Sequence, residues 1–133
     1  MPLKRDPSES KPFCVTLAGP LFESFCVQEA LKVTLALGAH PRFYYLRTKA
    51  GLEVDLIVEG ANGQLHPFEF KLSQTPKPEM GHAIERFCEE LEPSHSQPGG
   101  LVTLSNRSQM LTKNVRLMPM MEFLGELEKI AVI

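Results

Sequence analysis

The sequence predicts an α/β domain in which a mixed sheet is flanked by helices, in the order α-β-β-β-α-β with one more strand and one more helix appended. Three observations lead to this prediction. A long apolar helical segment precedes three β-rich runs that are separated by short turns, an amphipathic helix follows the third run, and a continuous apolar run typical of a buried strand comes next. Helices that alternate with strands in this way are typical of layered α/β folds.

The first helix is predicted from Pro20 through Leu37, because proline is favoured at the first helical position and Gly38 follows the last apolar residue. It is apolar nearly all round, as expected for a helix buried against a sheet. Residues 1–18, rich in proline, serine and charge in their first half, are expected to be a flexible or truncated N-terminal segment. Residues 19–133 are expected to form a single domain.

The later elements follow from periodicity and turn residues. Strands are predicted at 42–48, 53–59 and 65–72, a helix at 80–91, strands at 101–104 and 115–117, and a final helix after Pro119. In the final helix, either Met121, Leu124 and Leu127 or Phe123, Leu127 and Ile130 face inward. The expected core contains Phe22, Phe25, Val54, Leu56, Val58, Phe68, Phe70, Ile84, Phe87, Val102 and Leu104.

Composition narrows the function classes. The net charge of −2 provides no global basic field, so any nucleic-acid binding must come from a local patch. Three scattered cysteines and four single histidines indicate neither a disulfide framework nor a zinc site. No run approaches the length of a membrane span and no secretory leader opens the chain, so we expect a cytoplasmic protein without membrane contact.

The candidate site consists of Asp55 and, fourteen residues later, the triplet Glu69-Phe70-Lys71 on the next predicted strand. Mg²⁺ and Mn²⁺ take oxygen ligands, and Mg²⁺ is usually held by one or two carboxylates with water and substrate phosphate in the other positions. Asp55 and Glu69 suit that role. An ammonium beside the ion, here from Lys71, can orient the attacking water or offset charge that develops in the transition state.

The turn between the two strands decides whether this site can form. A five-residue connection over 60–64 pairs residues whose numbers sum to 124, which places Asp55 opposite Glu69 and Lys71 on the same face as Glu69. A tight Asn62-Gly63 turn would shift the sum to 125 and place the two acids on opposite faces.

Alternating charged and apolar residues are also what any sheet with one solvated face shows, and a cross-strand pair of Glu53 with Lys71 would then only stabilise the hairpin. This interpretation stays open beside the metal site. In the first helix, Glu29 is expected to pair locally with Lys32 at spacing i,i+3.

Two resemblances extend these inferences. The element order, with an acid in the middle strand and Glu-x-Lys in the next, resembles the core of the PD-(D/E)xK nuclease superfamily, the restriction-endonuclease-like fold. More closely, the chain from residue 19 to about 127 resembles a C-terminal domain of unknown function found in prokaryotic AAA-type ATPases. The segments that carry this resemblance are 19–25 (GPLFESF), Glu29 with 31–32 (LK), 44–48 (YYLRT), 51–55 (GLEVD), 68–73 (FEFKLS) and 115–117 (VRL) followed by Pro119.

The resemblance implies a restriction-endonuclease-like fold with Glu23 as the acid on the first helix, Asp55 and Glu69 as metal ligands and Lys71 as the catalytic lysine. A carboxylate in the first turns of a predicted helix is also favoured by the helix dipole alone. The sequence contains no Walker A motif and therefore no nucleotide site of that kind. We expect either a piece of a longer protein or a stand-alone descendant, with an ATPase domain as a possible partner.

Two functions follow from the sequence. The first is a divalent-metal-dependent nuclease, with Arg42, Arg47 and Lys49 as weak candidates for substrate binding, extended by Lys77, Lys113 and Arg116. The second is a catalytically silent interaction or nucleic-acid-binding module that regulates a partner ATPase. A cluster of Met118, Met120 and Met121 could contact another chain, although core packing is the simpler explanation.

Overall fold

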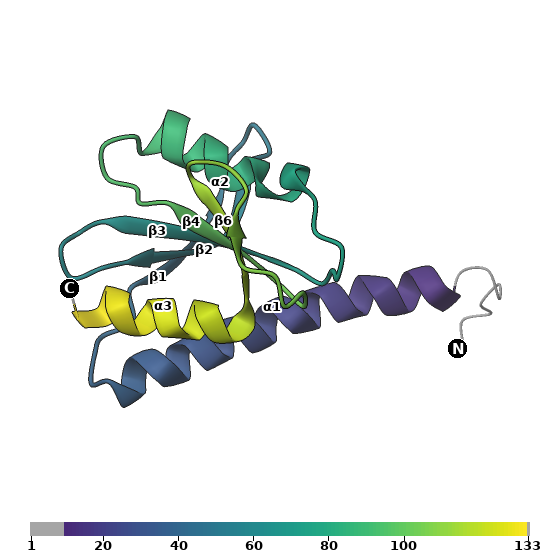
Figure 1. The fold of residues 1–133 in the computed structure, drawn as a ribbon, viewed down its shortest axis with the longest axis horizontal. Helices are drawn as coiled ribbons and strands as arrows, with labels where there is room; N and C mark the ends of the chain where they lie inside the picture. The colour runs from purple at the N-terminus through teal and green to yellow at the C-terminus, as the bar shows by residue number, and fades with distance from the viewer. Residues whose placement is uncertain (1–9, 133) are drawn as a thin grey trace.

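The computed structural model describes residues 10–132, with side chains placed for residues 17–131. It contains one six-stranded mixed sheet covered by helices on both faces, which confirms the predicted mixed α/β class (Figure 1). Among the described residues, no helix is both long and apolar enough to span a membrane.

The sheet has the strand order β1-β2-β3-β4-β6-β5. Strands β1, β2 and β3 form an antiparallel meander, β4 runs parallel to both β3 and β6, and β5 is antiparallel to β6. Their bounds are Phe43–Arg47 (β1), Glu53–Glu59 (β2), Leu65–Lys71 (β3), Gly99–Thr103 (β4), Gln109–Met110 (β5) and Val115–Pro119 (β6). The two-residue edge strand β5 was not predicted, because it lacks the apolar periodicity that marks longer strands.

Helix α1 (Ser10–Ala36) begins well before the predicted start, with Pro20 inside it. The backbone N–H groups of Leu37, Gly38 and Ala39 donate to carbonyl groups in the last turn of the helix. Gly38 has a φ of 74°, a backbone conformation that favours glycine. The prediction of the helix start was wrong because the φ of proline is itself helical, so a proline does not show where a helix begins. Residues 10–18 therefore belong to α1, while the expectation of a flexible or truncated segment over residues 1–9 lies outside the described residues.

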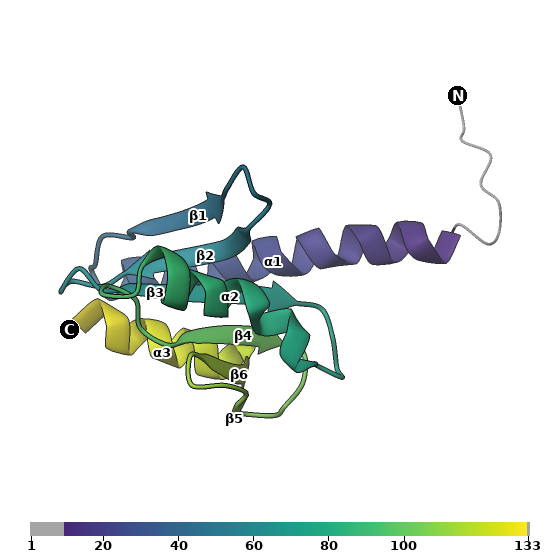
Figure 2. The ribbon, with the colours of Figure 1, turned by 90° about the horizontal axis from the view of Figure 1, so that it is seen from above.

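The second helical segment is continuous but irregular, with a 3₁₀ turn Pro78–Gly81 (η1), the short helix α2 (His82–Arg86) and a π-helical turn Phe87–Leu91 (η2). Helix α3 (Met120–Val132) starts directly after β6. Helices α1 and α3 pack together on one face of the sheet, and α2 covers the other (Figures 1 and 2). The N-terminal part of α1 projects beyond the sheet.

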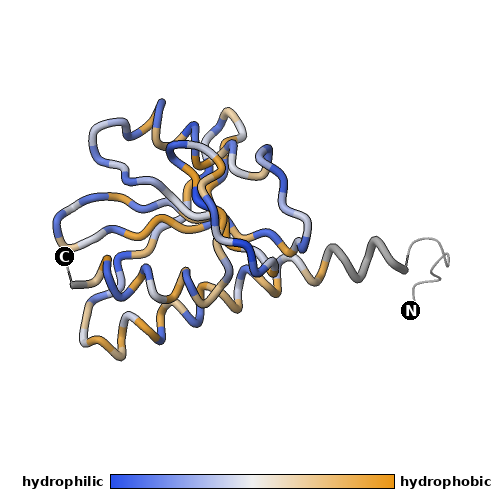
Figure 3. The backbone as a smooth tube through the Cα atoms, in the orientation of Figure 1, coloured by the Kyte–Doolittle hydropathy of each residue, from blue (hydrophilic) through white to orange (hydrophobic). Residues whose placement is uncertain are grey.

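Two apolar layers hold the elements together, one on each face of the sheet, and apolar stretches run along the central strands in Figure 3. Between the sheet and α1 with α3, the fully buried ring of Phe123 makes edge-on contacts with Phe68 and Phe70, at centroid distances of 4.9 and 5.2 Å. Between the sheet and α2 the layer contains Val54, Ile57, Ile84, Phe87, Cys88, Leu101, Val115 and Leu117.

Most of the predicted core is buried, but Phe22 is only partly buried and two members are exposed. Phe25 is 51% exposed on the outer side of α1, and Leu104 is 47% exposed because it follows the last residue of β4. In α3 the alternative with Phe123, Leu127 and Ile130 inward is the correct one, since Met121 is 78% exposed.

Candidate active site

The β2–β3 hairpin has the predicted register. Leu56 pairs with Phe68 and Glu59 with Leu65, so the partners sum to 124 and the tight two-residue turn does not form. The five-residue connection closes with a backbone bond of 2.9 Å from Gly60 to the Gln64 carbonyl, and Gly63 adopts a φ of 83° that favours glycine. The register therefore directs Asp55 and Glu69 toward each other.

The regular ladder stops one position before these two acids. Its last pair is Leu56 with Phe68, and beyond it the Phe70 backbone N–H donates to Asp55 Oδ2 at 2.9 Å. On its other side β2 carries a bulge, because one residue of β1, Tyr45, lies opposite two residues of β2, Leu56 and Asp55. Asp55 lies within that irregular stretch, which re-aims its side chain into the gap beside β3.

Glu69 is 4% exposed, and Asp55 lies beside it in the same cleft. Burial, together with the neighbouring Asp55, raises the pKa of Glu69 to about 9. Desolvation and the Asp55 charge both disfavour the ionised form of Glu69 and outweigh the nearby Lys71 charge, so one of the two carboxyl groups retains a proton. The pair therefore holds a proton at neutral pH, in a place where a cation could replace it.

Lys71 lies two residues beyond Glu69 on β3, and its Nζ is 4.0 Å from Glu69 Oε2. Its side chain is about half exposed, at 46%, whereas the carboxylate it faces is buried. The lysine charge opposes the rise in the pKa of Glu69 but is a smaller influence than burial. The predicted cross-strand pair with Glu53 is absent, since Glu53 instead pairs with Arg47 at 3.0 Å.

Glu23 approaches the same group from α1. Burial raises the pKa of Glu23, repulsion from Asp55 and Glu53 raises it further, and Lys71 lowers it. All four sequence-predicted residues are therefore brought into one electrostatic neighbourhood. The predicted local pair of Glu29 with Lys32 is also present, at 2.7 Å.

Two hollows meet at Asp55. A cleft of about 640 Å³ lies between the ends of β2 and β3 and the η1–α2 segment, and its polar lining is Glu53, Asp55, Glu69, Lys71, Lys77, Glu79, His82 and Arg86. A smaller hollow of about 170 Å³ lies toward α1 and is lined by Glu23, Tyr45, Leu46, Arg47, Glu53, Val54 and Asp55. Asp55 and Glu53 form the wall between them.

The cations proposed for substrate binding are only partly available. Arg42 is paired with Glu59 at 3.4 Å and Arg47 with Glu53 at 3.0 Å. Lys113 and Arg116 are paired with Glu89 and Glu122. The exposed Lys49 lies outside both hollows.

Sequence reasoning did not select His82 and Arg86, which line the cleft, or Tyr45, which lines the smaller hollow. Their spacing in the chain carries no signal for the site, because the packing of α2 on the sheet and the pairing of β1 with β2 decide which of their residues line the hollows. Lys77 was considered as part of a substrate path and does line the cleft.

Within the part of the chain described, no three or more histidine, cysteine, aspartate and glutamate side chains are grouped as a ready metal centre. The cleft contains the adjacent pair Asp55 and Glu69, with Glu23 facing the smaller hollow. This arrangement offers two hard oxygen donors and a cationic neighbour at the edge of a solvent-filled cleft.

These features define a mixed α/β domain with a pair of carboxyl groups in a cleft where the inner strands β2 and β3 meet the η1–α2 segment. The chain belongs to the family described as "Domain of unknown function (DUF4143)", which matches residues 18–123. The match contains Glu23, Asp55, Glu69 and Lys71. No curated protein and no solved structure shows a significant match to the chain.

Proposed function

We propose that this domain is a divalent-metal-dependent phosphodiesterase of the PD-(D/E)xK type that acts on nucleic acid. The observation that carries the proposal is that the β2–β3 register and the Phe70-to-Asp55 bond place Asp55 beside the buried Glu69 in one cleft, with Lys71 Nζ 4.0 Å from Glu69. The sheet supports it, because an antiparallel meander followed by a parallel fourth strand, with α1 and α2 on opposite faces, agrees with the restriction-endonuclease-like core that the sequence resembles.

The residues fit a Mg²⁺ or Mn²⁺ ion. Asp55 and Glu69 would hold it, since hard divalent cations prefer carboxylate oxygens and Mg²⁺ keeps several waters. The raised pKa of Glu69 means that a cation must displace a proton from the pair, and affinity should then rise with pH. When bound, such an ion polarises the phosphoryl group and acidifies a water molecule.

The chain's own groups have separable roles. The Phe70 N–H fixes the Asp55 carboxylate through a 2.9 Å bond, so the orientation of this ligand is set by the backbone of β3. Lys71 is half exposed at the cleft wall, where its charge can contact a phosphate oxygen. Lys77 lines the same cleft and can position the phosphate chain, and Arg86 lines it as well while paired with Glu90 at 3.2 Å.

The decisive experiment measures Mn²⁺ binding by calorimetry and metal-dependent cleavage of DNA and RNA with the same protein preparations. We expect wild type to bind Mn²⁺ and to cleave only in its presence, Asp55→Asn to lose binding, and Lys71→Ala to bind Mn²⁺ but lose turnover. Loss of a metal ligand removes metal binding and turnover together, whereas loss of a charge-stabilising group removes turnover and leaves metal binding intact. Lys129→Ala, which removes an exposed lysine of α3 that lines neither hollow, is the matched control.

A specific observation favours a second function, a silent module that docks on a partner. Leu17, Leu21 and Phe25 are all exposed and recur at spacing four, so they form one apolar stripe along the outer side of α1. By resemblance the partner would be an AAA-type ATPase domain. If wild type shows no heat with millimolar Mn²⁺ and Asp55→Asn is at least as stable as wild type, the acids are a mutually repelling surface and the docking function is preferred.

A further inference from the structure

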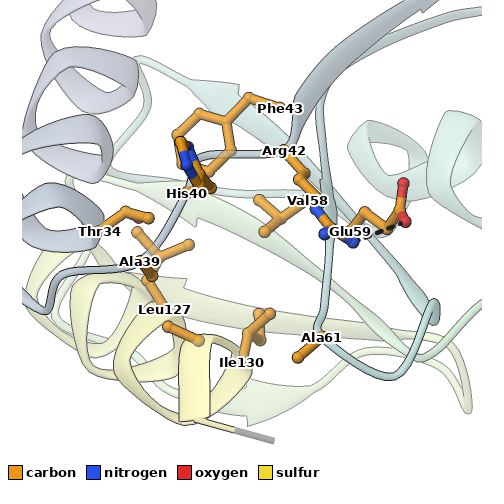
Figure 4. A pocket seen from close by; sticks show the side chains of 11 residues that line it. Thr34, Ala39, His40, Arg42, Phe43, Val58, Glu59, Ala61, Leu127 and Ile130 are labelled. Carbon is orange, nitrogen blue, oxygen red and sulfur yellow. Dashed lines mark hydrogen bonds and ion pairs between the residues drawn. The ribbon is translucent and has the colours of Figure 1, made fainter.

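A separate cavity, distinct from the two hollows at Asp55, lies at the opposite end of the sheet from the acids. It is formed by the end of α1, the start of β1, the end of β2 and the end of α3 (Figure 4). Along α1, Thr34 at this cavity is eleven residues from Glu23, which corresponds to about 16 Å of helix. The cavity shares no lining residue with either hollow at the acids, so the two sites can be tested independently.

The cavity measures about 260 Å³. Its walls are mainly apolar, with Ala39, Phe43, Val58, Ala61, Leu127, Ile130 and Ala131 as lining residues. An apolar cavity of about 150 Å³ holds one benzene molecule, so this one has room for a ring bearing a small substituent. Thr34 adds no unpaired donor, because its hydroxyl donates to the Ala30 carbonyl at 2.9 Å.

The charged lining residues, Arg42 and Glu59, lie together where β1 and β2 adjoin the cavity (Figure 4). Arg42 Nη1 donates to Glu59 Oε2 at 3.4 Å, and Tyr44 Oη donates to Glu59 Oε1 at 3.2 Å. Both Glu59 oxygens are thus occupied, whereas a guanidinium has five N–H groups and the Arg42 side chain makes one such bond. In Figure 4, Arg42 and His40 stand beside the apolar lining. The rim has a surplus of donors.

The charges around the cavity decide which kind of acceptor group on a ligand these N–H donors would bind. The C-terminal ends of α1 and α3 both adjoin the cavity, and the negative end of each helix dipole disfavours an anion, to which the Glu59 charge adds. A neutral carbonyl avoids these penalties and still gains the strong bond that a charged donor gives. An ammonium would meet the Arg42 charge.

We propose that this cavity binds a small uncharged ligand with a ring-sized apolar body and one carbonyl acceptor, which receives a hydrogen bond from Arg42. The site is separate from the acid pair, so it requires neither a metal nor phosphodiesterase activity.

The test uses three probes that share a ring and differ in charge: benzamide, benzoate and benzylamine. Each is titrated to about 10 mM, high enough to detect a millimolar dissociation constant, while backbone amide chemical shifts are recorded. We expect benzamide to shift the amides of Ala39, Val58 and Ile130 and to bind more tightly than the other two probes. No shift there, or equal or tighter binding of either charged probe, overturns the proposal.

Two variants and a control complete the test. Arg42→Met keeps an apolar stem but removes the donors, and should weaken benzamide about tenfold or more. Ala131→Leu fills the cavity and should abolish binding. Arg47→Met removes the arginine at the end of β1, which also pairs with a glutamate of β2 but lies outside this cavity, and should leave benzamide affinity unchanged. Unaltered affinity in Arg42→Met or Ala131→Leu, or an equal loss in Arg47→Met, contradicts the proposal.

Discussion

The Phe70 backbone N–H donates to Asp55 Oδ2 at 2.9 Å, across a gap where the β2–β3 ladder has already ended at Leu56 and Phe68. The carboxylate thus replaces a strand as the acceptor for a partly buried N–H group. This bond fixes the Asp55 side chain beside Glu69, and it makes the aspartate a structural residue as well as a candidate ligand.

Replacing Asp55 by alanine and by asparagine should separate these two roles. Asn keeps an oxygen that can accept from Phe70, so Asp55→Asn should retain the fold, whereas Asp55→Ala leaves the N–H without a partner and should cost about 1–3 kcal/mol more. Urea denaturation of the two variants measures the difference. Equal stability would show that water satisfies the Phe70 N–H.

Stability should fall as pH rises because of Glu69. Its pKa is about 9 in the folded protein against an ordinary value of 4.5, so between these values the folded state holds more protons than the unfolded state. The stabilising contribution is complete below about pH 4.5 and is lost as pH rises toward 9. We expect a loss of more than about 1 kcal/mol across this window, given about 1.4 kcal/mol per unit of pKa shift.

The control for this pH dependence is Glu69→Gln, which carries no titrating group. Its free energy of unfolding, measured in urea from pH 5 to pH 9, should stay flatter than that of wild type and exceed it at the alkaline end. Parallel curves would mean that another group is responsible.

Removal of the Lys71 ammonium should lower metal-dependent turnover by about 10² or more, the usual cost of losing one group that stabilises transition-state charge. Because a half-exposed lysine contributes little to packing, the free energy of unfolding should change by less than about 1 kcal/mol. Single-turnover cleavage with saturating Mn²⁺ is the measurement. A rate within about threefold of wild type would remove Lys71 from the proposed mechanism.

Two phenylalanines offer a matched test of the core. Phe70 is buried against Phe123, so Phe70→Ala should cost about 3–5 kcal/mol, whereas Phe25→Ala removes an exposed ring and should cost less than about 1 kcal/mol. Denaturant midpoints converted with the m-value give both numbers. A large loss at Phe25 alone would indicate that the outer stripe of α1 is covered by another molecule.

Two glycines should respond oppositely to alanine. A Cβ at Gly99 would overlap the backbone carbonyl oxygen of Pro67, so Gly99→Ala should be strongly destabilising. A Cβ at Gly125 meets nothing within 4 Å on helix α3, so Gly125→Ala should stabilise the protein by about 0.5–1 kcal/mol. Thermal unfolding of both variants checks the sign, and destabilisation by Gly125→Ala would contradict the described packing of α3.

Local pattern was sufficient for the hairpin and for the pairing of Asp55 with Glu69. Side chains alternate with a period of two, so loop length alone settles which residues face each other, and the connection from Gly60 to Gln64 determined the register. The same reasoning failed at the start of α1, where a proline that fits inside a helix gave a false boundary. It also failed at Phe25, whose exposure depends on where α3 and the sheet lie.

The amino-acid sequence by itself thus determined the order of the main elements, the register of the hairpin and the placing of Asp55, Glu69 and Lys71 on one face, because these depend on short-range periodicity and turn geometry. Glu23 was a candidate only through the family resemblance. Only the tertiary structure decided that β4 runs parallel to β3, that a bulge in β2 re-aims Asp55, and that the η1–α2 segment brings Lys77 and Arg86 to the cleft. It also decided the raised pKa of Glu69, since desolvation is a property of everything packed around a carboxylate and not of its neighbours in the chain.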